Sequence, residues 1–368
     1  MSGDAPGRDD GPRFDEGALR AQAGAILGAW GFGPDPVEKS VDGLVWADLR
    51  GIASHGVAML PIYEGWLRAG RFDVSAKPAV VAEGPVVATV DGGSGMGFAA
   101  AHAAMTLAIA KARRLGLAAV AVRRSNHFGA AGRWATMASD AGLIGLATSS
   151  TVSPAIVPTG GLAARFGTNP IAFAAPGERG APFVLDMATS TVALGRLMVA
   201  SLRGEPVPEG WALGPDGRPT TDPALGYRSR LATPLGALPE LSSHKGSGLA
   251  AMVEILSVLL PGATLSMDDP GPGARGDVGH CFVVLDPRAF DGGERFGATL
   301  DAMLGRLRAT PAADPARPVL AAGDPERAAL SRARTHGVAL PRALVASLRE
   351  VAARAGCAWV LGPATGPV

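Results

Sequence analysis

The chain has 368 residues, of which 47% are hydrophobic and 18% are charged, and its formal net charge is +1. This length allows a large hydrophobic core, and the near-zero charge offers no basic field for nucleic acid or an anionic membrane surface. The two cysteines, Cys281 and Cys357, exclude a disulfide framework and a cysteine-rich metal centre, and we expect a reducing, cytoplasmic location.

The N-terminal part of the chain is predicted to be helical after a short tail. Residues 1–12 are polar and rich in Gly, Pro and Asp, which predicts a disordered tail and neither a secretion signal nor a membrane anchor. Apolar residues at helical spacing predict one helix over 14–31 and a second over about 35–53. A further short helix is predicted over 61–70, because a proline opens that stretch and a glycine closes it.

The second of these helices leads into the stretch Asp48–Gly56, which carries a histidine beside a serine. His55 is one of six histidines, and histidine is the side chain best suited to exchanging a proton near neutral pH. The flanking glycines let backbone approach a ligand closely. Most histidines are structural or simply exposed, so position alone makes His55 a candidate and no more.

Residues 79–122 predict strands, a glycine-rich turn, an alanine-rich helix and a further buried strand. The turn, residues 93–97, is similar to a dinucleotide-binding fingerprint, and Arg123 and Arg124 stand where a 2′-phosphate would bind. A flexible strand-to-helix turn explains the same glycines. From the residues alone, both interpretations stay open.

Later polar turns follow predicted strands, which is where ligands commonly bind. The stretch 183–190 predicts a strand that runs into Asp186 and then into small hydroxylated residues. This carboxylate can orient a histidine, bind a ribose or cap a helix. His244 and Lys245 open an apolar helix, whose backbone N–H groups offer a phosphate cradle or are simply an ordinary helix start. Two amphipathic helices are predicted between 324 and 360.

Seven stretches together resemble the malate/L-lactate dehydrogenase family, which also includes ureidoglycolate, sulfolactate and diketogulonate dehydrogenases and Δ1-piperideine-2-carboxylate reductase. They occur in the family's order and extend over most of residues 14–350. The stretches are DLRGIASHGV (48–57), SNHFGAAG (125–132), GTNPIAFAAP (167–176), VLDMATS (184–190), PEGWALGPDGRPTTDP (208–223), HKGSGLA (244–250) and GHCFVVLDP (279–287).

The resemblance implies an α/β fold with three layers, α/β/α, around a mixed sheet, and not a Rossmann fold. It implies helical N- and C-terminal segments, residues 13–78 and 311–368, that pack on each other beside an α/β region over 79–310. The glycines at 93–97 would then serve only to form a backbone turn and would not bind the cofactor. The family also works as homodimers, with the active site near the subunit boundary.

For the chemistry, the resemblance implies an NAD- or NADP-dependent oxidoreductase in which His55 donates a proton to a carbonyl or imine. Ser54 and Asp186 would complete a relay, and a carboxylate beside the imidazole would raise its pKa. No metal is expected, because no two histidines have ligand spacing on one helix. The implied cofactor contacts are His127, Thr168, Asn169, Pro170, Met187, Ala188, Thr189, Ser190, His244, Lys245, Gly323 and Asp324.

One position departs from the family pattern. Family members usually carry an arginine four residues after the catalytic histidine, whereas this chain has Met59. A methionine lacks the paired N–H donors with which a guanidinium binds a carboxylate. We therefore expect a small ketone or imine substrate that is not a standard 2-oxo acid, in a pocket that includes Arg50, Met59, Asn126 and His127. The alternatives are an ordinary 2-hydroxy acid dehydrogenase in which another arginine, such as Arg50 or Arg133, grips the carboxylate, a catalytically silent binding protein, or a Rossmann reductase.

Overall fold

The computed structural model describes residues 11–362 except 152, 269–270, 272 and 292, so the tail predicted over 1–12 lies almost wholly outside the described residues. The helices are α1 (Glu16–Ala29), α2 (Pro34–Leu49), α3 (Leu60–Arg68), α4 (Gly97–Leu115), α5 (Ala131–Asp140), α6 (Leu194–Arg203), α7 (Pro223–Ser229), α8 (His244–Glu254), α9 (Phe296–Arg308), α10 (Asp324–His336) and α11 (Arg342–Ala355). Short 3-10 turns are η1 (Ala53–His55), η2 (Val57–Met59), η3 (Pro239–Leu241), η5 (Pro287–Ala289) and η6 (Gly293–Arg295), and η4 (Ile255–Leu259) is a π-helical turn.

The strands of the described residues form one mixed seven-stranded sheet and two small ribbons, β1–β11 and β8–β9. The large sheet has the order β2-β3-β4-β10-β5-β6-β7, in which β3 and β4 are parallel and the other neighbours antiparallel. The strands are β1 (Arg13–Phe14), β2 (Ala79–Glu83), β3 (Val87–Asp91), β4 (Leu117–Ser125), β5 (Ile144–Ser149), β6 (Ile171–Ala175), β7 (Phe183–Met187), β8 (Ala212–Leu213), β9 (Pro219–Thr220), β10 (Val278–Leu285) and β11 (Val338–Ala339).

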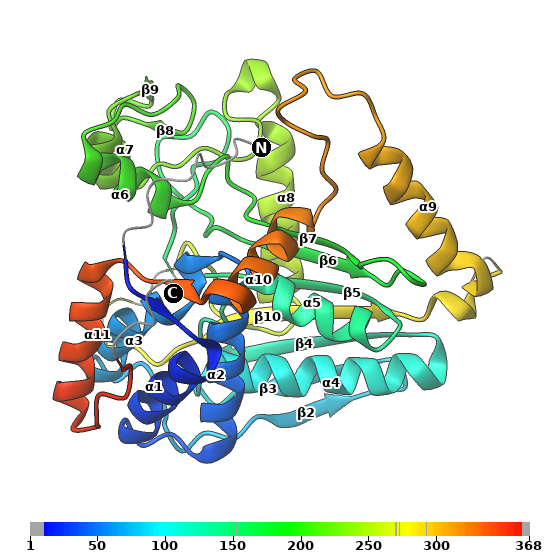
Figure 1. Cartoon of the computed structure of the whole chain (residues 1–368), viewed down its shortest axis with the longest axis horizontal. Helices are drawn as coiled ribbons and strands as arrows, with labels where there is room; N and C mark the ends of the chain where they lie inside the picture. Colours follow the sequence, from blue (N-terminus) through cyan, green and yellow to red (C-terminus); the bar gives the residue numbers. More distant parts are fainter. Residues whose placement is uncertain (1–10, 152, 269–270, 272, 292, 363–368) are drawn as a thin grey trace.

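Helices cover both faces of the sheet, which confirms the predicted three-layer α/β/α architecture (Figure 1). Along β5, Gly145 faces Ala135 of α5. Thr148 lies three positions further on and so on the opposite face, where its hydroxyl bonds to Ser257 of η4. The first layer therefore contains α4 and α5, and the opposite layer contains α8, η4 and α9.

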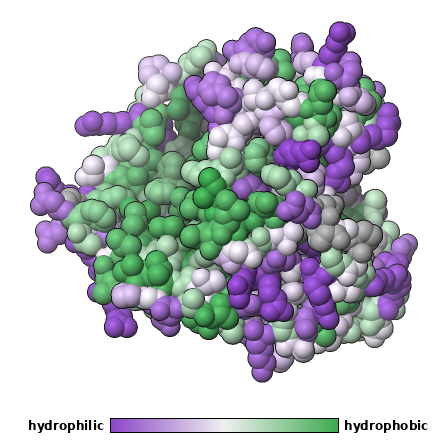
Figure 2. Space-filling view, turned by 180° about the vertical axis from the view of Figure 1, so that it is seen from behind, coloured by the Kyte–Doolittle hydropathy of each residue, from purple (hydrophilic) through white to green (hydrophobic). Residues whose placement is uncertain are grey.

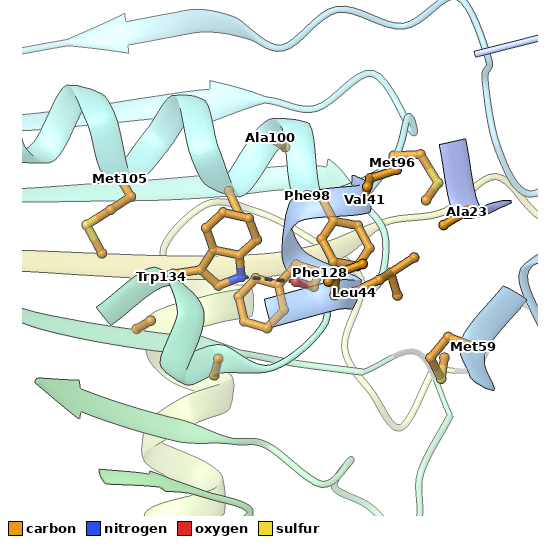
Figure 3. Close-up of a cluster of buried hydrophobic side chains, with 14 of the residues drawn as sticks. Ala23, Val41, Leu44, Met59, Met96, Phe98, Ala100, Met105, Phe128 and Trp134 are labelled. Carbon is orange, nitrogen blue, oxygen red and sulfur yellow. Dashed lines mark hydrogen bonds between the residues drawn. The ribbon is translucent and has the colours of Figure 1, made fainter. Parts of the chain in front are cut away.

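The parallel pair β3–α4–β4 is the strand–helix–strand unit expected from the sequence. Buried alanines line α4 at helical spacing, and their small side chains let the helix pack closely on β4. Gly116 ends the helix with a φ of +87°, a conformation that glycine adopts without strain. The core next to this unit contains Phe98, Phe128 and Trp134, whose indole N–H donates to the carbonyl of Phe128 at 3.0 Å (Figure 3).

The two ends of the chain pack on each other. Arg13 of β1 pairs with Ala339 of β11, and Gln22 of α1 accepts hydrogen bonds from the backbone N–H groups of Val360 and Leu361. The segment boundaries at 78/79 and 310/311 stay a prediction.

Candidate active site

A short turn presents His55. The helix predicted over 35–53 ends earlier than predicted, because α2 stops at Leu49. Gly51 follows with a φ of +75°, which breaks the helical backbone. The 3-10 turn η1 then carries Ser54 and His55. Their side chains are hydrogen-bonded, with Ser54 Oγ 2.8 Å from His55 Nδ1. The Nε2 atom of His55 is therefore the ring nitrogen left for a substrate.

A buried carboxylate lies beneath this turn. Asp48 is 5% exposed, and its Oδ2 accepts the backbone N–H of Val57 at 2.8 Å. Gly56 leaves the room for it, since a Cβ there would overlap the carboxylate. Burial raises the pKa of Asp48 to about 7, although the hydrogen bond from Val57 opposes the shift. Asp48 thus holds the turn from inside the protein.

His127 stacks on His55, with ring centroids 5.3 Å apart and planes 27° apart. Its Nδ1 lies 2.6 Å from the Tyr63 hydroxyl and accepts the N–H of Gly129 at 3.3 Å, which assigns the ring proton of neutral His127 to Nε2. Trp66 adds a third ring, 6.3 Å from His127. Sequence reasoning missed Tyr63 and Trp66, which share one face of α3 at a spacing of three residues.

The electrostatics of this pair favour neutral rings. Burial lowers the pKa of His55 to about 4, and burial together with the neighbouring His55, His280 and Arg71 lowers that of His127. The expectation that a carboxylate raises the pKa of His55 is wrong, because the ring is bonded to Ser54 and has no hydrogen-bonded carboxylate among the described residues. His55 is therefore a neutral imidazole at pH 7.

Asp186 lies on β7 and binds the start of α5. Its Oδ2 accepts the backbone N–H of Gly132 at 2.7 Å, and a side chain at Gly132 would collide with it. Desolvation raises the pKa of Asp186 to about 6. No hydrogen bond joins Asp186 to His55 in the described part of the chain, so its place in a relay stays a prediction.

The residues predicted to hold the cofactor come largely together at one end of the sheet. The start of β6 lies beside the end of β7, where Ile171 pairs with Met187, and the N–H and hydroxyl of Thr189 donate to the carbonyl of Thr168. Asn169 donates to the carbonyl of Ala250 on α8 at 3.0 Å. The exposed His244 and Lys245 open that same helix, and Pro170 and Ala188 lie within the two turns.

Two polar atoms in this region have no hydrogen-bond partner among the described residues: Asn169 Oδ1 and Ser190 Oγ, both buried. Buried polar atoms in native proteins are nearly always satisfied, so these two fit a ligand with hydroxyl or amide groups. Gly323, with a φ of +93°, packs against Val184 of β7 and starts α10, while Asp324 binds Arg308. These polar groups suit the hydroxyl and amide groups of a nucleotide.

The glycine-rich turn at 93–97 is structural, and the Rossmann interpretation is wrong. A Rossmann sheet is mostly parallel, whereas here only β3 and β4 are. A Cβ at Gly97 would overlap the carbonyls of Asn126 and His127, so the turn supports the loop that carries His127. Arg123 and Arg124 pair with Asp91, each at 3.4 Å.

The arginines weighed as substitutes for position 59 are engaged elsewhere. Arg50 lies over the Trp46 ring at 4.1 Å, and Arg133 is bonded to Asp42 at 2.7 Å. Burial and the neighbouring Arg133 lower the pKa of Arg50 to about 10. Met59 is 9% exposed and belongs to the hydrophobic core (Figure 3).

A different arginine, which sequence reasoning missed, lies near the imidazoles. The Arg71 guanidinium stacks on Trp66 at 5.0 Å, and its Nε donates to Asn126 Oδ1 at 3.0 Å. Asn126 is fully buried and directly precedes His127. No sequence signal marks this position, because α3 separates it from His55 along the chain.

A hollow of about 1190 Å³ lies beside the segment that leads to His55, and its wall includes Asp48, Ala53 and the C-terminal half of α10. It lies away from the predicted cofactor residues of β6, β7 and α8. Among the described residues, no cluster of His, Cys, Asp and Glu suits a metal ion, and no helix combines the length and hydropathy needed to span a bilayer.

The sequence model of the malate/L-lactate dehydrogenase family matches residues 14–349. Malate dehydrogenase of Pyrococcus horikoshii is 36% identical over 90% of this chain and 92% of the relative. Its solved structure superposes with a TM-score of 0.85 at 34% identity, over 94% of this chain and 96% of that one. (2R)-3-Sulfolactate dehydrogenase (NADP+) of Chromohalobacter salexigens is 38% identical over 89% of this chain and 94% of the relative. Δ1-Pyrroline-2-carboxylate reductase of Ancylobacter novellus is 36% identical over the same shares.

Proposed function

The chain belongs to the malate/L-lactate dehydrogenase family of oxidoreductases, and we propose that it reduces a small carbonyl or imine substrate with His55 as the proton donor. The observation that carries this proposal is the pairing of Ser54 with His55 Nδ1, which directs Nε2 toward a substrate. A bound reduced nicotinamide would supply the hydride to the substrate carbon. The protein then has to neutralise the charge that develops on oxygen or nitrogen.

A neutral imidazole performs this task through a change of tautomer. His55 holds a proton at Nε2 and gives it to the substrate atom as negative charge accumulates there. The Ser54 hydroxyl proton moves at the same time to Nδ1, so the ring stays neutral, in agreement with its lowered pKa. The exposed Ser54 is reprotonated from solvent, and this proton balances the one that the substrate receives. We also propose that Asp186, whose pKa burial raises to about 6, belongs to the relay. Such transfers contribute roughly 10²–10⁴-fold to rate.

Two further contacts orient the donor. The Asp48 carboxylate fixes the backbone at Val57, two residues after His55. His127 stacks on the His55 ring, and Tyr63 holds His127 in place. Preorganised groups of this kind lower the barrier because they need no rearrangement during the reaction.

For the cofactor, we propose that the turns after Gly167 and Asp186, the start of α8 and the Gly323–Asp324 turn hold NAD or NADP. Asn169 Oδ1 and Ser190 Oγ would each gain a hydrogen-bond partner. Lys245, exposed beside the α8 N-terminus, would bind a phosphate.

For the assembly, we propose a homodimer. Met252, Ile255 and Leu259 present exposed apolar side chains on successive turns of α8 and η4, with Ile255 54% and Leu259 59% exposed. Figure 2 shows a broad hydrophobic area on the face opposite to that of Figure 1, the side of the sheet that α8 and η4 cover. Exposed apolar areas of this extent mark contact surfaces, and a second copy would bury this one at the C-terminal end of α8.

Fluorescence of the reduced nicotinamide tests the proposal. Titration of the purified protein into NADH and into NADPH is expected to enhance or shift the emission of at least one of them. Lys245→Ala should weaken this binding, whereas Lys77→Ala, an exposed lysine before β2, should not. Absence of binding to both nucleotides at millimolar concentration would contradict the proposed function.

A further inference from the structure

We infer that Glu254 is a positioning residue of the proposed cofactor site. It fixes the amide of Asn169 so that Asn169 Oδ1 accepts a hydrogen bond from a donor group of the bound nucleotide. That donor is either a carboxamide N–H of the nicotinamide or a ribose hydroxyl. This inference rests on the proposed function, because it concerns the same cofactor site.

The Asn169 amide has one orientation that satisfies its neighbours. Its Nδ2 donates to Glu254 Oε1 and to the Ala250 carbonyl, both at 3.0 Å, so both amide N–H groups are used. A flipped amide would place Oδ1 against these two acceptors, and a carboxylate has no proton to donate. Oδ1 therefore faces away from both groups, and it can bind only a ligand group that donates.

The neighbouring hydroxyl does not satisfy this oxygen. Asn169 is fully buried, and its Oδ1 has no hydrogen-bond partner among the described residues. The oxygen lies beside Gly167, where a Cβ would be 2.8 Å from it and would also overlap Thr151 Oγ1. The Thr151 hydroxyl donates its one proton to the Ser153 carbonyl at 3.1 Å. The acceptor on Asn169 is thus available to a bound nucleotide.

This acceptor belongs to the turns that we assign to the cofactor. Asn169 follows Thr168, whose carbonyl accepts the N–H and the hydroxyl of Thr189. Ser190, next along the chain, carries a second buried oxygen that lacks a partner in the described part of the protein. Two such atoms on joined turns suit one polar ligand that contacts both.

Glu254 is a buried carboxylate without a cation. It is 4% exposed, and no arginine or lysine of the described residues forms an ion pair with it. Its other contacts are the hydroxyl and the N–H of Ser266, and α8 changes to the π-helical turn η4 directly after it. Burying a carboxyl group without a cation costs stability, so its place is better explained by the contact that it orients. Turns of the π type also occur frequently at functional sites.

Calorimetric titration with the reduced nucleotide that the parent binds, NADH or NADPH, tests this inference. Asn169→Gly removes the amide and keeps the φ of +40°, which glycine adopts without strain. Glu254→Met removes the acceptor that orients the amide, whereas Glu254→Gln keeps one acceptor oxygen at the same length. Ser266→Ala is the matched control, because it removes another contact of Glu254 and leaves that of Asn169 in place.

Asn169→Gly and Glu254→Met are each expected to raise the Kd of the nucleotide by about 10-fold, the effect of losing one buried hydrogen bond. Glu254→Gln and Ser266→Ala should stay within about 3-fold of the parent. Ser266→Ala should nevertheless lower the melting temperature, as Glu254→Met does, because both lose a buried hydrogen bond. Affinity and stability are thereby separated.

A second nucleotide identifies the donor. In the reduced 3-acetylpyridine analogue, a methyl group replaces the carboxamide nitrogen, and the riboses are unchanged. A loss on Asn169→Gly that is confined to the ordinary nucleotide assigns the donor to the carboxamide. Equal losses on both nucleotides assign it to a ribose hydroxyl.

A Kd that is unchanged in Asn169→Gly, or in folded Glu254→Met, would overturn the inference and leave the proposed function in place. A loss in Ser266→Ala equal to that in Glu254→Met would also overturn it, because Glu254 would then have a structural role only. Circular dichroism verifies folding, and Glu254→Asp, whose shorter side chain withdraws the acceptor, replaces a Glu254→Met that does not fold. Failure of the parent to bind either reduced nucleotide would instead overturn the proposed function, and this inference with it.

Discussion

At the scale of single residues, three ionisable groups of the candidate site, His55, Asp48 and Asp186, have pKa values displaced toward their neutral forms. Burial lowers the pKa of His55 to about 4 and raises those of Asp48 and Asp186 to about 7 and about 6. A low-dielectric setting disfavours charge of either sign, so one cause explains all three shifts. Such a setting favours proton transfer through a neutral imidazole at His55.

Asp48→Asn tests the raised carboxyl pKa through stability. In the unfolded chain Asp48 loses its proton near pH 3.8, whereas in the folded protein it keeps the proton up to about pH 7. The parent therefore loses stability between pH 4 and 7, and the amide variant, which can still accept the Val57 N–H, does not. In urea unfolding, the unfolding free energy of Asp48→Asn relative to that of the parent should rise across this range. The rise should reach on the order of a few kcal/mol at pH 7 and above.

A difference in unfolding free energy that stays constant from pH 4 to 8 would contradict the pKa assigned to Asp48. The contribution of Asp186 cancels, because both proteins carry it.

The sequence identified Ser54 and His55 because they are adjacent and stand in a motif. It could not identify Tyr63, Trp66 or Arg71, since these reach the site only when α3 folds back against the loop after β4. The expected rise in the pKa of His55 was wrong for the same reason, because it depended on a carboxylate contact that only tertiary structure decides.

At the scale of elements, the spacing of apolar residues and the glycines that end helices predicted most helices and strands near their observed positions. The sequence did not predict α9, whose apolar residues Leu300 and Leu304 pack on the sheet. It also placed the end of α2 four residues late, because Gly51 and the Asp48–Val57 bond break the helix locally. Glycines at 93–97 were open to two interpretations, since a close backbone approach and a phosphate site both require glycine.

Gly97→Ala tests the structural interpretation of that turn. Its methyl group would overlap the carbonyls of Asn126 and His127, so we expect a loss of about 1–3 kcal/mol of unfolding free energy. Gly65→Ala is the matched control inside α3, where nothing lies within 4 Å of the new Cβ, and it should stabilise the protein by up to about 1 kcal/mol. Equal stability of the two variants in urea unfolding would argue against close packing at Gly97.

At the scale of the whole molecule, the mixed sheet brings β6, β7 and α8 together at one end, and the turn between α2 and α3 presents His55. The homodimer and the segment boundaries were expected from family resemblance, which no pattern within a single chain can establish. The exposed apolar side of α8 and η4 gives the proposed dimer a physical basis.

Ile255→Glu and Leu259→Glu are expected to convert the proposed dimer to a monomer, because a carboxylate would be buried without a partner in the interface. Light scattering after size exclusion measures the mass directly. Leu115→Glu is the control, since Leu115 is 49% exposed at the end of α4 in the opposite helical layer. A parent protein that is monomeric at micromolar concentration, or charged variants that stay dimeric, would contradict this interface.

The central claim is that His55 donates the proton during hydride transfer, and single-turnover reduction by His55→Ala tests it most directly. With bound NADH or NADPH and a substrate that the parent reduces, we expect the rate of nucleotide oxidation to fall by roughly 10²–10⁴-fold. The Kd of the nucleotide should stay within about 3-fold of the parent value, which separates chemistry from binding. A single-turnover rate equal to that of the parent would remove His55 from the reaction.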